Sequence, residues 1–146
     1  MNIKIEMPDD FGKELVQTLI KVEGKVSKDV ASVINQGLLA IETRAKLGSP
    51  VDTGRLRSSI HAVAIGKSDE YRYSDNAGNS YDGALAEAGT EGNDGTGYVG
   101  TNVEYAPDQE FGGEDGKKGG HKFLTRATAE MAPKIESELK KLNIKP

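Results

Sequence analysis

The two histidines, His61 and His121, are the side chains in this sequence best suited to acid–base chemistry near neutral pH. His61 lies in a run that is typical of a β-strand, and His121 lies in a glycine-rich loop. Neither belongs to an HExxH motif or another metal-binding spacing, and no G-x-S-x-G segment supplies a nucleophilic serine. We therefore expect both histidines to be solvated or to lie in an interface, and we expect no catalytic residues.

Two loops resemble ligand-binding motifs, but each lacks a residue that the motif requires. Asp75, Asn76, Asn79 and Asp82 lie close together in the sequence, yet Ala77 occupies a position of the calcium-loop template that needs an oxygen ligand. The segment 112–120 contains glycines and lysines, as phosphate-binding loops do, but no serine or threonine follows a lysine there. We expect neither a metal site nor a cofactor, and we interpret 112–120 as a mobile loop that becomes ordered against a partner.

The composition limits the class of protein further. The 146 residues suit one domain, and the shares of hydrophobic (36%) and charged (29%) residues indicate a globular but polar chain. The absence of cysteine excludes disulfides, zinc–thiolate sites and iron–sulfur clusters. The formal charge of −4 disfavours tight binding to nucleic acid. The start Met1–Glu6 has no apolar segment of the kind found in signal peptides, so we expect no signal peptide. No apolar stretch approaches the ~20 residues of a membrane span, so we expect no membrane association.

The N-terminal part of the chain is predicted to be helical. Apolar residues recur at steps of three and four over residues 10–47, which is typical of one buried helical face. The sequence predicts a long helix that is either unbroken or broken at Gly24, with Lys25–Leu47 as its second part. Gly48 is predicted to be a left-handed C-cap, and Pro50 cannot continue the helix.

The middle of the chain is predicted to form antiparallel strands with long loops. Most of the 18 glycines lie there, between runs rich in β-formers at Leu56–Ile65, Glu70–Ser74 and Tyr98–Val103. Residues 84–88 fit either a strand or a helical turn. Because strands and helices do not alternate along the chain, the predicted fold class is α+β and not a doubly wound α/β fold.

The C-terminal part is again predicted to be helical, with apolar residues at helical spacing over 123–143 and a kink or restart at Pro133. This helix is expected to pack on one face of the antiparallel sheet. We expect a single domain over 1–146, divided into 1–47 (helical), 50–112 (mainly antiparallel strands and loops), 113–122 (a flexible loop) and 123–143 (the C-terminal helix).

The segment 48–60 carries the most specific pattern in the sequence, and this pattern predicts a corner between a helix and a strand. Asp52 can accept hydrogen bonds from the amides that follow it, and Gly54 permits a positive φ. Leu56 and Ile60 are expected to anchor the first strand against the long helix. A well-made corner accounts for this pattern without any function.

The same segment resembles a family of head–tail joining, or tail-completion, proteins of tailed bacteriophages. Three blocks carry the resemblance in the family's order: Pro50–Ile60 (PVDTGRLRSSI), Tyr105–Gly112 (YAPDQEFG) and Gly120–Ala127 (GHKFLTRA). The family often has prolines just before Phe123 and near Arg126, where this chain has Lys122 and Arg126. The first block is specific, the second moderately so, and the third is weak alone.

The resemblance implies a structural virion protein without enzymatic activity. Such proteins form rings, here a hexamer or a dodecamer, that complete the tail or join it to the DNA-filled head. The implied partners are other copies of the chain and the neighbouring head-completion and tail proteins. DNA is expected to pass through the ring without tight binding, and the protein is expected to be made in the bacterial host cytoplasm.

The residues that the resemblance assigns to structural or interface roles lie in its three blocks. They are Pro50, Asp52, Thr53, Gly54, Arg55, Leu56, Arg57, Ser59, Ile60, Tyr105, Glu110, Phe111, Gly112, Phe123 and Leu124.

Charge pairing between copies is a further hypothesis, because ring contacts join two different patches. The basic residues of one patch would be Arg55, Arg57, Lys117, Lys118 and Lys122. The acidic residues of the other patch would be Asp69, Glu70, Glu91, Asp94 and Asp108. Charge reversal at Arg55 and Arg57 is then expected to weaken assembly and to leave the monomer folded.

The sequence is also compatible with other functions. Within virion proteins, the chain fits a tail terminator or a minor tail protein. From other classes, it fits a small α+β hydrolase, which needs a cleft with converging polar groups, or a regulatory nucleic-acid-binding module, which the acidic charge disfavours.

Overall fold

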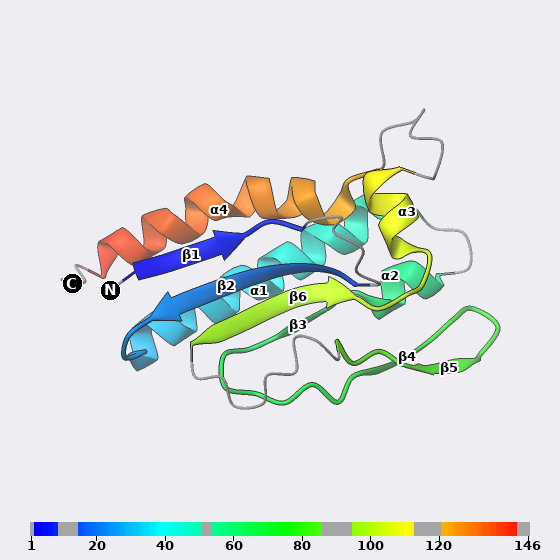
Figure 1. Cartoon of the computed structure of the whole chain (residues 1–146), viewed down its shortest axis with the longest axis horizontal. Coiled ribbons are helices and arrows are strands. Elements are labelled where there is room, and N and C mark those ends of the chain that lie inside the picture. The colour runs from blue at the N-terminus through cyan, green and yellow to red at the C-terminus, as the bar shows by residue number, and fades with distance from the viewer. Residues whose placement is uncertain (1, 9–14, 51–53, 86–94, 113–120, 143–146) are drawn as a thin grey trace.

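The computed structural model of the chain describes residues 2–8, 15–50, 54–85, 95–112 and 121–142 (Figure 1). The helices and strands follow one another in the order β1 (Asn2–Glu6), β2 (Val16–Glu23), α1 (Lys28–Gly48), α2 (Arg55–Ser59), β3 (His61–Val63), β4 (Arg72–Ser74), β5 (Ser80–Asp82), β6 (Thr96–Thr101), α3 (Ala106–Phe111) and α4 (Phe123–Lys141).

One antiparallel sheet has the strand order β1-β2-β6-β3, and β4 and β5 form a separate antiparallel hairpin. The late strand β6 lies between two earlier strands, with Val16 of β2 opposite Thr101 and Val63 of β3 opposite Tyr98. The predicted α+β class, with an antiparallel sheet, a long helix and a C-terminal helix, is confirmed.

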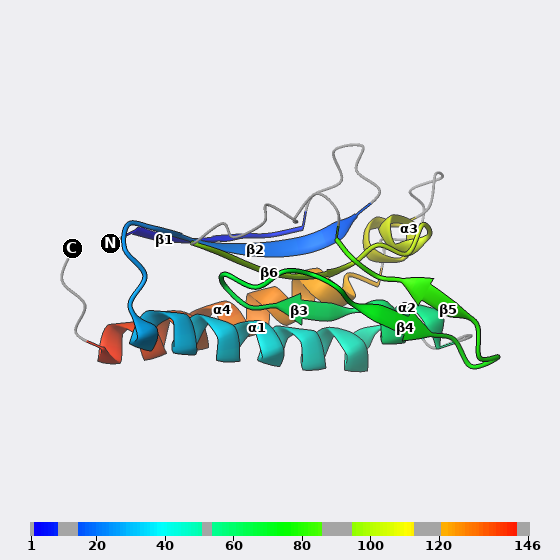
Figure 2. The same cartoon turned by 90° about the horizontal axis from the view of Figure 1, so that it is seen from below.

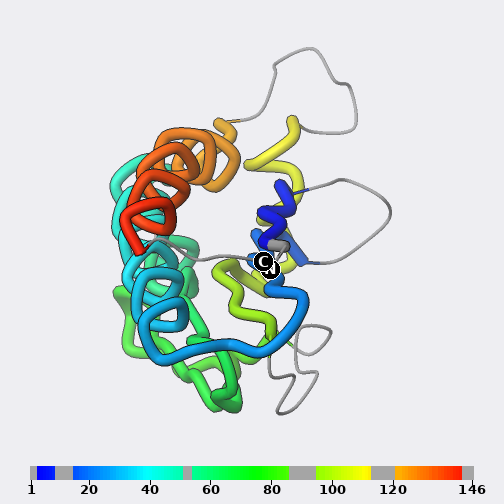
Figure 3. Tube along the Cα trace, turned by 90° about the vertical axis from the view of Figure 1, so that its left-hand side faces the viewer, coloured from blue at the N-terminus to red at the C-terminus, as the bar shows by residue number. Residues whose placement is uncertain are grey.

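The molecule has two layers, with α1 and α4 side by side against one face of the sheet (Figures 2 and 3). The core lies between the layers, where Ile20 of β2, Ile34 and Ile41 of α1, and Leu124 of α4 are fully buried. A buried hydrogen bond of 2.6 Å between the hydroxyls of Thr18 and Thr128 also joins β2 to α4.

The predicted helix is wrong over residues 16–23, which form the strand β2, and residues 10–14 lie outside the described part of the chain. Val16 and Ile20 face the helices, while Leu19 faces the opposite side of the sheet. There it packs against a second apolar cluster, which consists of Leu15, Val63, Leu85 and Tyr98. The burial of β2 alternates, but the polar Thr18 occupies one buried position and the apolar Leu19 lies half-buried on the other face. Val16, Leu19 and Ile20 therefore show steps of three and four without a helix. Gly24, with a φ of 104°, lies in the turn after this strand and does not break a helix.

The strand β1 was not expected, and the predicted helical region 1–47 is therefore wrong here too. Ile3 and Ile5 pack against the core, whereas Lys4 is exposed. This alternation is the ordinary pattern of a strand with one buried face. Lys4 and Lys21, on the neighbouring strand, both lie 3.5 Å from the carboxylate of Glu6.

The helix α1 confirms the second part of the predicted N-terminal helix. It begins where the Ser27 hydroxyl accepts a hydrogen bond of 3.2 Å from the amide of Val30. At its other end, the amide and hydroxyl of Ser49 donate to the carbonyl of Lys46, at 3.3 and 2.8 Å. Gly48 is the last helical residue and has no positive φ, so the predicted left-handed C-cap is wrong.

The helix α4 continues through Pro133, so the predicted restart does not occur. Pro133 is exposed, and the missing amide and the ring therefore lie on the solvent side of the helix. On its other side α4 approaches α1 closely, because a Cβ atom on Gly37 would lie 2.6 Å from Ile135.

The predicted strands in the middle of the chain are shorter than expected. The first half of Leu56–Ile65 forms the helix α2, and only 61–63 form a strand. The runs Glu70–Ser74 and Tyr98–Val103 contain β4 and most of β6, and β5 was not predicted. Residues 84 and 85 lie in neither a helix nor a strand, and 86–88 are outside the described residues.

Candidate binding site at the corner between the long helix and the sheet

The corner after α1 contains an additional helical turn that the sequence pattern did not predict. Gly54 has a φ of 78° and precedes α2, so the predicted positive φ is confirmed. A Cβ atom at Gly54 would lie 2.5 Å from the side-chain oxygen of Asn76, which brings the β4–β5 turn against the corner. Leu56 and Ile60 are buried in the core, as expected, although Leu56 lies in α2 and not in a strand.

A continuous stack of rings connects the sheet to this corner. His61 stacks on Tyr71 with ring centroids 4.1 Å apart, Tyr71 neighbours Tyr73 at 6.4 Å, and Tyr73 stacks on Tyr81 at 5.1 Å. The guanidinium of Arg55 lies 4.2 Å from the centre of the Tyr81 ring. The stack therefore ties β3, the β4–β5 hairpin and α2 into one unit.

Arg55 ends the stack in a bidentate ion pair. Its two terminal nitrogens donate to the two carboxylate oxygens of Glu104, both at 2.8 Å, and its guanidinium also lies 5.7 Å from the ring of Tyr105. The pair with Glu104 raises the pKa of Arg55 further above its usual range and lowers the pKa of Glu104. Arg55 is thus bound within its own chain.

Asp75 holds the turn of the β4–β5 hairpin. One carboxylate oxygen accepts from the amides of Ala77 and Asn79, both at 2.9 Å. The other accepts from the Asn79 side chain at 3.0 Å and from the Tyr81 hydroxyl at 2.8 Å. The hydrogen bonds from Asn79 and Tyr81 lower the pKa of Asp75 to about 2. These four donors explain the clustering of acids and asparagines in this loop without a metal ion.

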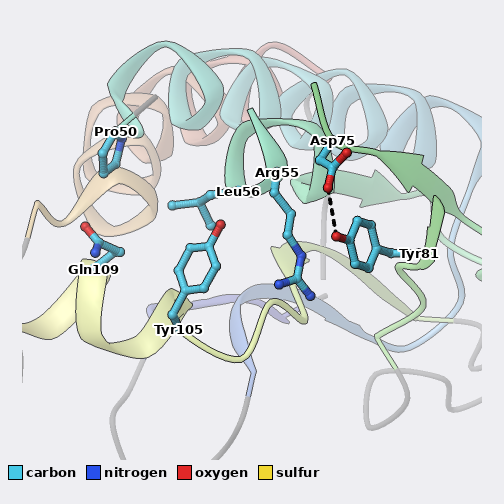
Figure 4. Close-up of a pocket in the computed structure, with 7 residues that line it drawn as sticks. All are labelled: Pro50, Arg55, Leu56, Asp75, Tyr81, Tyr105 and Gln109. Atoms are coloured by element: carbon cyan, nitrogen blue, oxygen red, sulfur yellow. Dashed lines mark hydrogen bonds between the residues drawn. The ribbon is translucent and has the colours of Figure 1, made fainter. Parts of the chain in front are cut away.

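These side chains surround a pocket of about 420 Å³, which we call the corner pocket (Figure 4). Its lining residues are Pro50, Arg55, Leu56, Asp75, Tyr81, Tyr105 and Gln109. Figure 4 shows Tyr105 and Gln109 on α3 and the segment before it, facing Pro50 and Leu56 across the hollow. The pocket thus brings together residues of the first two blocks, which lie far apart in the sequence.

His61 is buried, with 3% of its surface exposed, so the expectation of a solvated or interface histidine is wrong. Its Nδ1 lies 2.9 Å from the carbonyl oxygen of Ser59, and its Nε2 lies 3.0 Å from each carboxylate oxygen of Asp69. Asp69 also accepts from the amides of Tyr71 and Leu85, at 3.2 and 2.8 Å. Both ring nitrogens of His61 therefore lie within hydrogen-bond distance of oxygen atoms inside the fold, so the ring has a structural role there. His121 is exposed, as expected.

Glu110 joins α3 to the start of α4. The side chain is fully buried, and its carboxylate accepts from the amide of Leu124 at 3.0 Å and from the amide of Thr125 at 2.7 Å. The residue that precedes α4, Lys122, has a φ of 51° and makes no side-chain cap of its own. Glu110 therefore caps the helix from a distant part of the chain. Burial raises the pKa of Glu110, and the hydrogen bonds from Thr125 oppose this shift.

The structure places the remaining residues of the three blocks in different surroundings. Ser59 is buried and pairs with the Thr101 hydroxyl at 2.6 Å, and Phe123 and Leu124 are buried in the core. Arg57 donates to the carbonyl of Ser49 at 3.3 Å. Phe111 packs partly buried against the core, and Gly112, with a φ of 96°, ends α3.

Two residues of the charge-pairing hypothesis already have partners within the chain. Arg55 is paired with Glu104, and the side chain of Asp69 is buried against His61. Lys122, Glu70 and Asp108 are exposed. Six predicted residues lie outside the described part of the chain, namely Asp52, Thr53, Glu91, Asp94, Lys117 and Lys118.

The aromatic stack and Glu104 were missed by the sequence analysis. A signal was present, because three of the five tyrosines fall at 71, 73 and 81, and Tyr71 and Tyr73 have the spacing of residues on one face of a strand. Nothing in the sequence indicates that Glu104 reaches Arg55, because this contact depends on the position of β6 in the sheet.

Within the described ranges, no group of His, Asp and Glu side chains is arranged to hold a metal ion. The described helices also include none that is long and apolar enough to cross a membrane.

A comparison with known proteins identifies the family to which the chain belongs. Residues 13–112, more than half of the chain, match the family model HK97-gp10_like, which is described as "Bacteriophage HK97-gp10, putative tail-component". The match spans β2, α1, the corner and β6. The chain therefore belongs to this family of bacteriophage tail components, in agreement with the resemblance drawn from its sequence. No curated protein and no solved structure matched the chain.

Proposed function

We propose that this protein is a ring-forming subunit of the virion that completes the tail or joins it to the DNA-filled head. The family match over residues 13–112 carries this proposal, because it identifies the chain as a structural tail component. A join between two rotationally symmetric machines is naturally made by a ring of identical copies, each of which meets its neighbour through two different patches.

The chemistry of the corner supports a role in binding and not in catalysis. In the described part of the chain, the charged groups that converge on the corner pocket already have partners. Arg55 pairs with Glu104, and Asp75 accepts hydrogen bonds within its own turn. His61 is likewise occupied at both nitrogens. A hydrolytic site needs a base beside a nucleophile in an open cleft, so the hydrogen bonds that already occupy these groups favour a binding role.

The architecture supports a rigid assembly unit. The stack from His61 to Arg55 fixes the β4–β5 hairpin to α2, and Glu110 fixes α3 to α4. A preorganised surface loses less conformational entropy on assembly than a mobile one, so ring contacts made by these elements are stronger for the same contact area.

The proposed partners are other copies of the chain and the neighbouring head-completion and tail proteins, and synthesis takes place in the bacterial host cytoplasm. DNA is proposed to pass through the ring without tight binding, in keeping with the formal charge of −4.

Deletion of the gene from the phage that carries it tests this role, with electron microscopy of the resulting particles. Filled heads and free tails, separate from each other, are the expected result. Tails of abnormal length would instead support a tail terminator, and normal infectious particles would refute the proposal. Restoration of joining by the gene supplied from a plasmid is the control.

A further inference from the structure

Both legs of the β4–β5 hairpin are fastened to one carboxylate, that of Asp69. The hairpin forms its own two-stranded sheet beside the main one (Figure 1). One oxygen of Asp69 accepts from the amide of Tyr71, just before β4, at 3.2 Å, and the other accepts from the amide of Leu85, after β5, at 2.8 Å. The Asp69 side chain is only 4% exposed, so these hydrogen bonds are shielded from water.

The same carboxylate contacts His61 of β3, and the hydrogen-bond partners of this ring indicate how many hydrogens it carries. Its Nδ1 lies 2.9 Å from the carbonyl oxygen of Ser59, which can only accept a hydrogen bond. Its Nε2 lies 3.0 Å from both oxygens of Asp69, which act as acceptors toward two backbone amides as well. A hydrogen on each ring nitrogen satisfies every one of these contacts, whereas either neutral tautomer places a lone pair against an oxygen.

The aromatic neighbour of His61 also suits a cation. The ring of Tyr71 lies parallel to that of His61, with an angle of 12° between the planes and 4.1 Å between the centroids. The face of an aromatic ring is negative and attracts a positive charge. The aromatic stack then has a cation at each end, because Arg55 lies over Tyr81 at the other end.

The remaining titratable groups around the pair, in the described part of the chain, come from three segments. They are Glu42 and Lys46 on α1, Tyr98 on β6, and Lys67 and Glu70 in the segment between β3 and β4. Glu42 accepts from the amide of Ala62, next to His61, at 2.8 Å. Burial and the charge of Asp69 raise the pKa of Tyr98, which keeps its hydroxyl neutral. Together with Asp69, the anions outnumber the cations, and this balance stabilises a positive charge on His61.

We propose that His61 is an imidazolium in the folded protein, and that its ion pair with Asp69 is a proton-dependent clasp that fastens the β4–β5 hairpin to the main sheet. Loss of one proton from His61 leaves two lone pairs facing each other in a buried place, and the Asp69 side chain then loosens together with both legs of the hairpin. The clasp therefore holds at lower pH and weakens as the pH rises. The hairpin carries Asp75 and Tyr81 to the corner pocket, so the clasp also fixes these side chains. It is a property of the single chain and does not depend on the proposed ring.

The number of protons on His61 can be measured in the natural chain, because His61 and His121 are its only histidines. Long-range ¹H–¹⁵N correlation spectra of the labelled protein are recorded at about pH 7.5, where a free histidine is mostly neutral. We expect both ring nitrogens of His61 to have the chemical shifts of an imidazolium. His121→Gln assigns the signals, because it removes those of the exposed histidine. One nitrogen without a proton on His61 would overturn the proposal.

A titration to higher pH then tests whether the proton holds the hairpin. We expect the backbone amide signals of Tyr73 and Tyr81, on the two strands of the hairpin, to shift with the same midpoint as the His61 ring. The amide signals of Ile34 and Leu38, on α1, should stay in place. Hairpin signals that do not follow His61, or α1 signals that follow it equally, would contradict a clasp specific to the hairpin.

Asp69→Asn provides a second measurement, because it removes the charge with little change in shape. We expect hydrogen exchange of the hairpin amides to become about tenfold faster or more, the factor that corresponds to the loss of one charge-assisted hydrogen bond, with exchange in α1 unchanged. Glu70→Gln makes the same chemical change at the exposed neighbouring acid and should leave all exchange rates unchanged. Equal hairpin rates in the two variants would overturn the clasp. If Asp69→Asn does not fold, the spectra and the titration of the natural chain still decide.

Discussion

Arg55 illustrates how much of this corner depends on single side chains. Its guanidinium is planar, which allows it to lie over the Tyr81 ring while both terminal nitrogens bind Glu104. A lysine ammonium carries the same charge but offers neither the flat face nor the paired donors. The charge alone therefore does not reproduce the contact.

Arg55→Lys is expected to lower the free energy of unfolding by about 1 kcal/mol, because the stacking and the paired hydrogen bonds are lost. Urea denaturation of the purified protein measures this change. Arg126→Lys, at an exposed position of α4, is the matched control and should change stability by less than about 0.5 kcal/mol. Equal effects of the two substitutions would show that the stack contributes nothing to stability.

Glu110 gives the fold a pH dependence that can be separated from that of other acids. Its pKa is raised above the ordinary value of 4.5, so the folded state binds the proton more tightly than the unfolded state. The contribution of this group is then fully present below pH 4.5 and falls as the pH rises through the folded-state pKa. Unfolding free energies of the natural chain and of Glu110→Gln, measured from acidic to neutral pH, should diverge in this direction. Parallel curves would contradict the assigned shift.

At the scale of elements, the contact between α1 and α4 is set by a glycine. A Cβ atom at Gly37 would lie 2.6 Å from two atoms of Ile135, whereas one at Gly48 would lie 3.9 Å from Phe123. The first position has no room for a methyl group, and the second has an ordinary van der Waals contact.

Gly37→Ala is therefore expected to destabilise the protein by about 1–3 kcal/mol through overpacking, even though alanine favours helices. Gly48→Ala, at the end of the same helix, should be neutral or stabilising. Thermal unfolding monitored by circular dichroism compares the two variants. A stabilising Gly37→Ala would mean that the helices can move apart at little cost.

The elements also show where sequence reasoning succeeded and where it failed. The helices α1 and α4 were predictable because each has one buried and one exposed face, so that their apolar residues recur with the helical period. The strand β2 was mistaken for a helix because its buried face includes the polar Thr18, while the apolar Leu19 lies on the other face and packs against a cluster that includes the distant Leu85.

The candidate site was predictable only in part. The pattern around Gly54 indicated a corner, and the resemblance placed Arg55 and Tyr105 among the residues with structural or interface roles. The partners Tyr81, Asp75 and Glu104 come from a hairpin and from the end of β6, and only the folded sheet brings them to the corner. Contacts of this kind, between distant segments, leave no periodic pattern in the sequence.

At the scale of the whole molecule, the net charge of −4 governs behaviour toward DNA. A chain with a net negative charge is repelled by the phosphates of a duplex, so binding should be weak and should depend little on salt. Fluorescence anisotropy of a labelled duplex, titrated with the isolated protein at about 50 and 200 mM salt, is expected to show dissociation constants no tighter than ~10⁻⁶ M. A submicromolar affinity that falls steeply with salt would contradict the proposed passage of DNA without adhesion.

The position of β6 between β2 and β3 has a consequence for biosynthesis. Val16 of β2 finds its partner only when Thr101 has been made, a delay of roughly 4–17 s at translation speeds of about 5–20 residues per second. Until then the nascent chain carries a strand with an apolar face and an open edge, the kind of segment that chaperones shield and that aggregates when translation stalls. Ribosome pausing before residue 96 should therefore be more harmful to the yield of this protein than pausing after it.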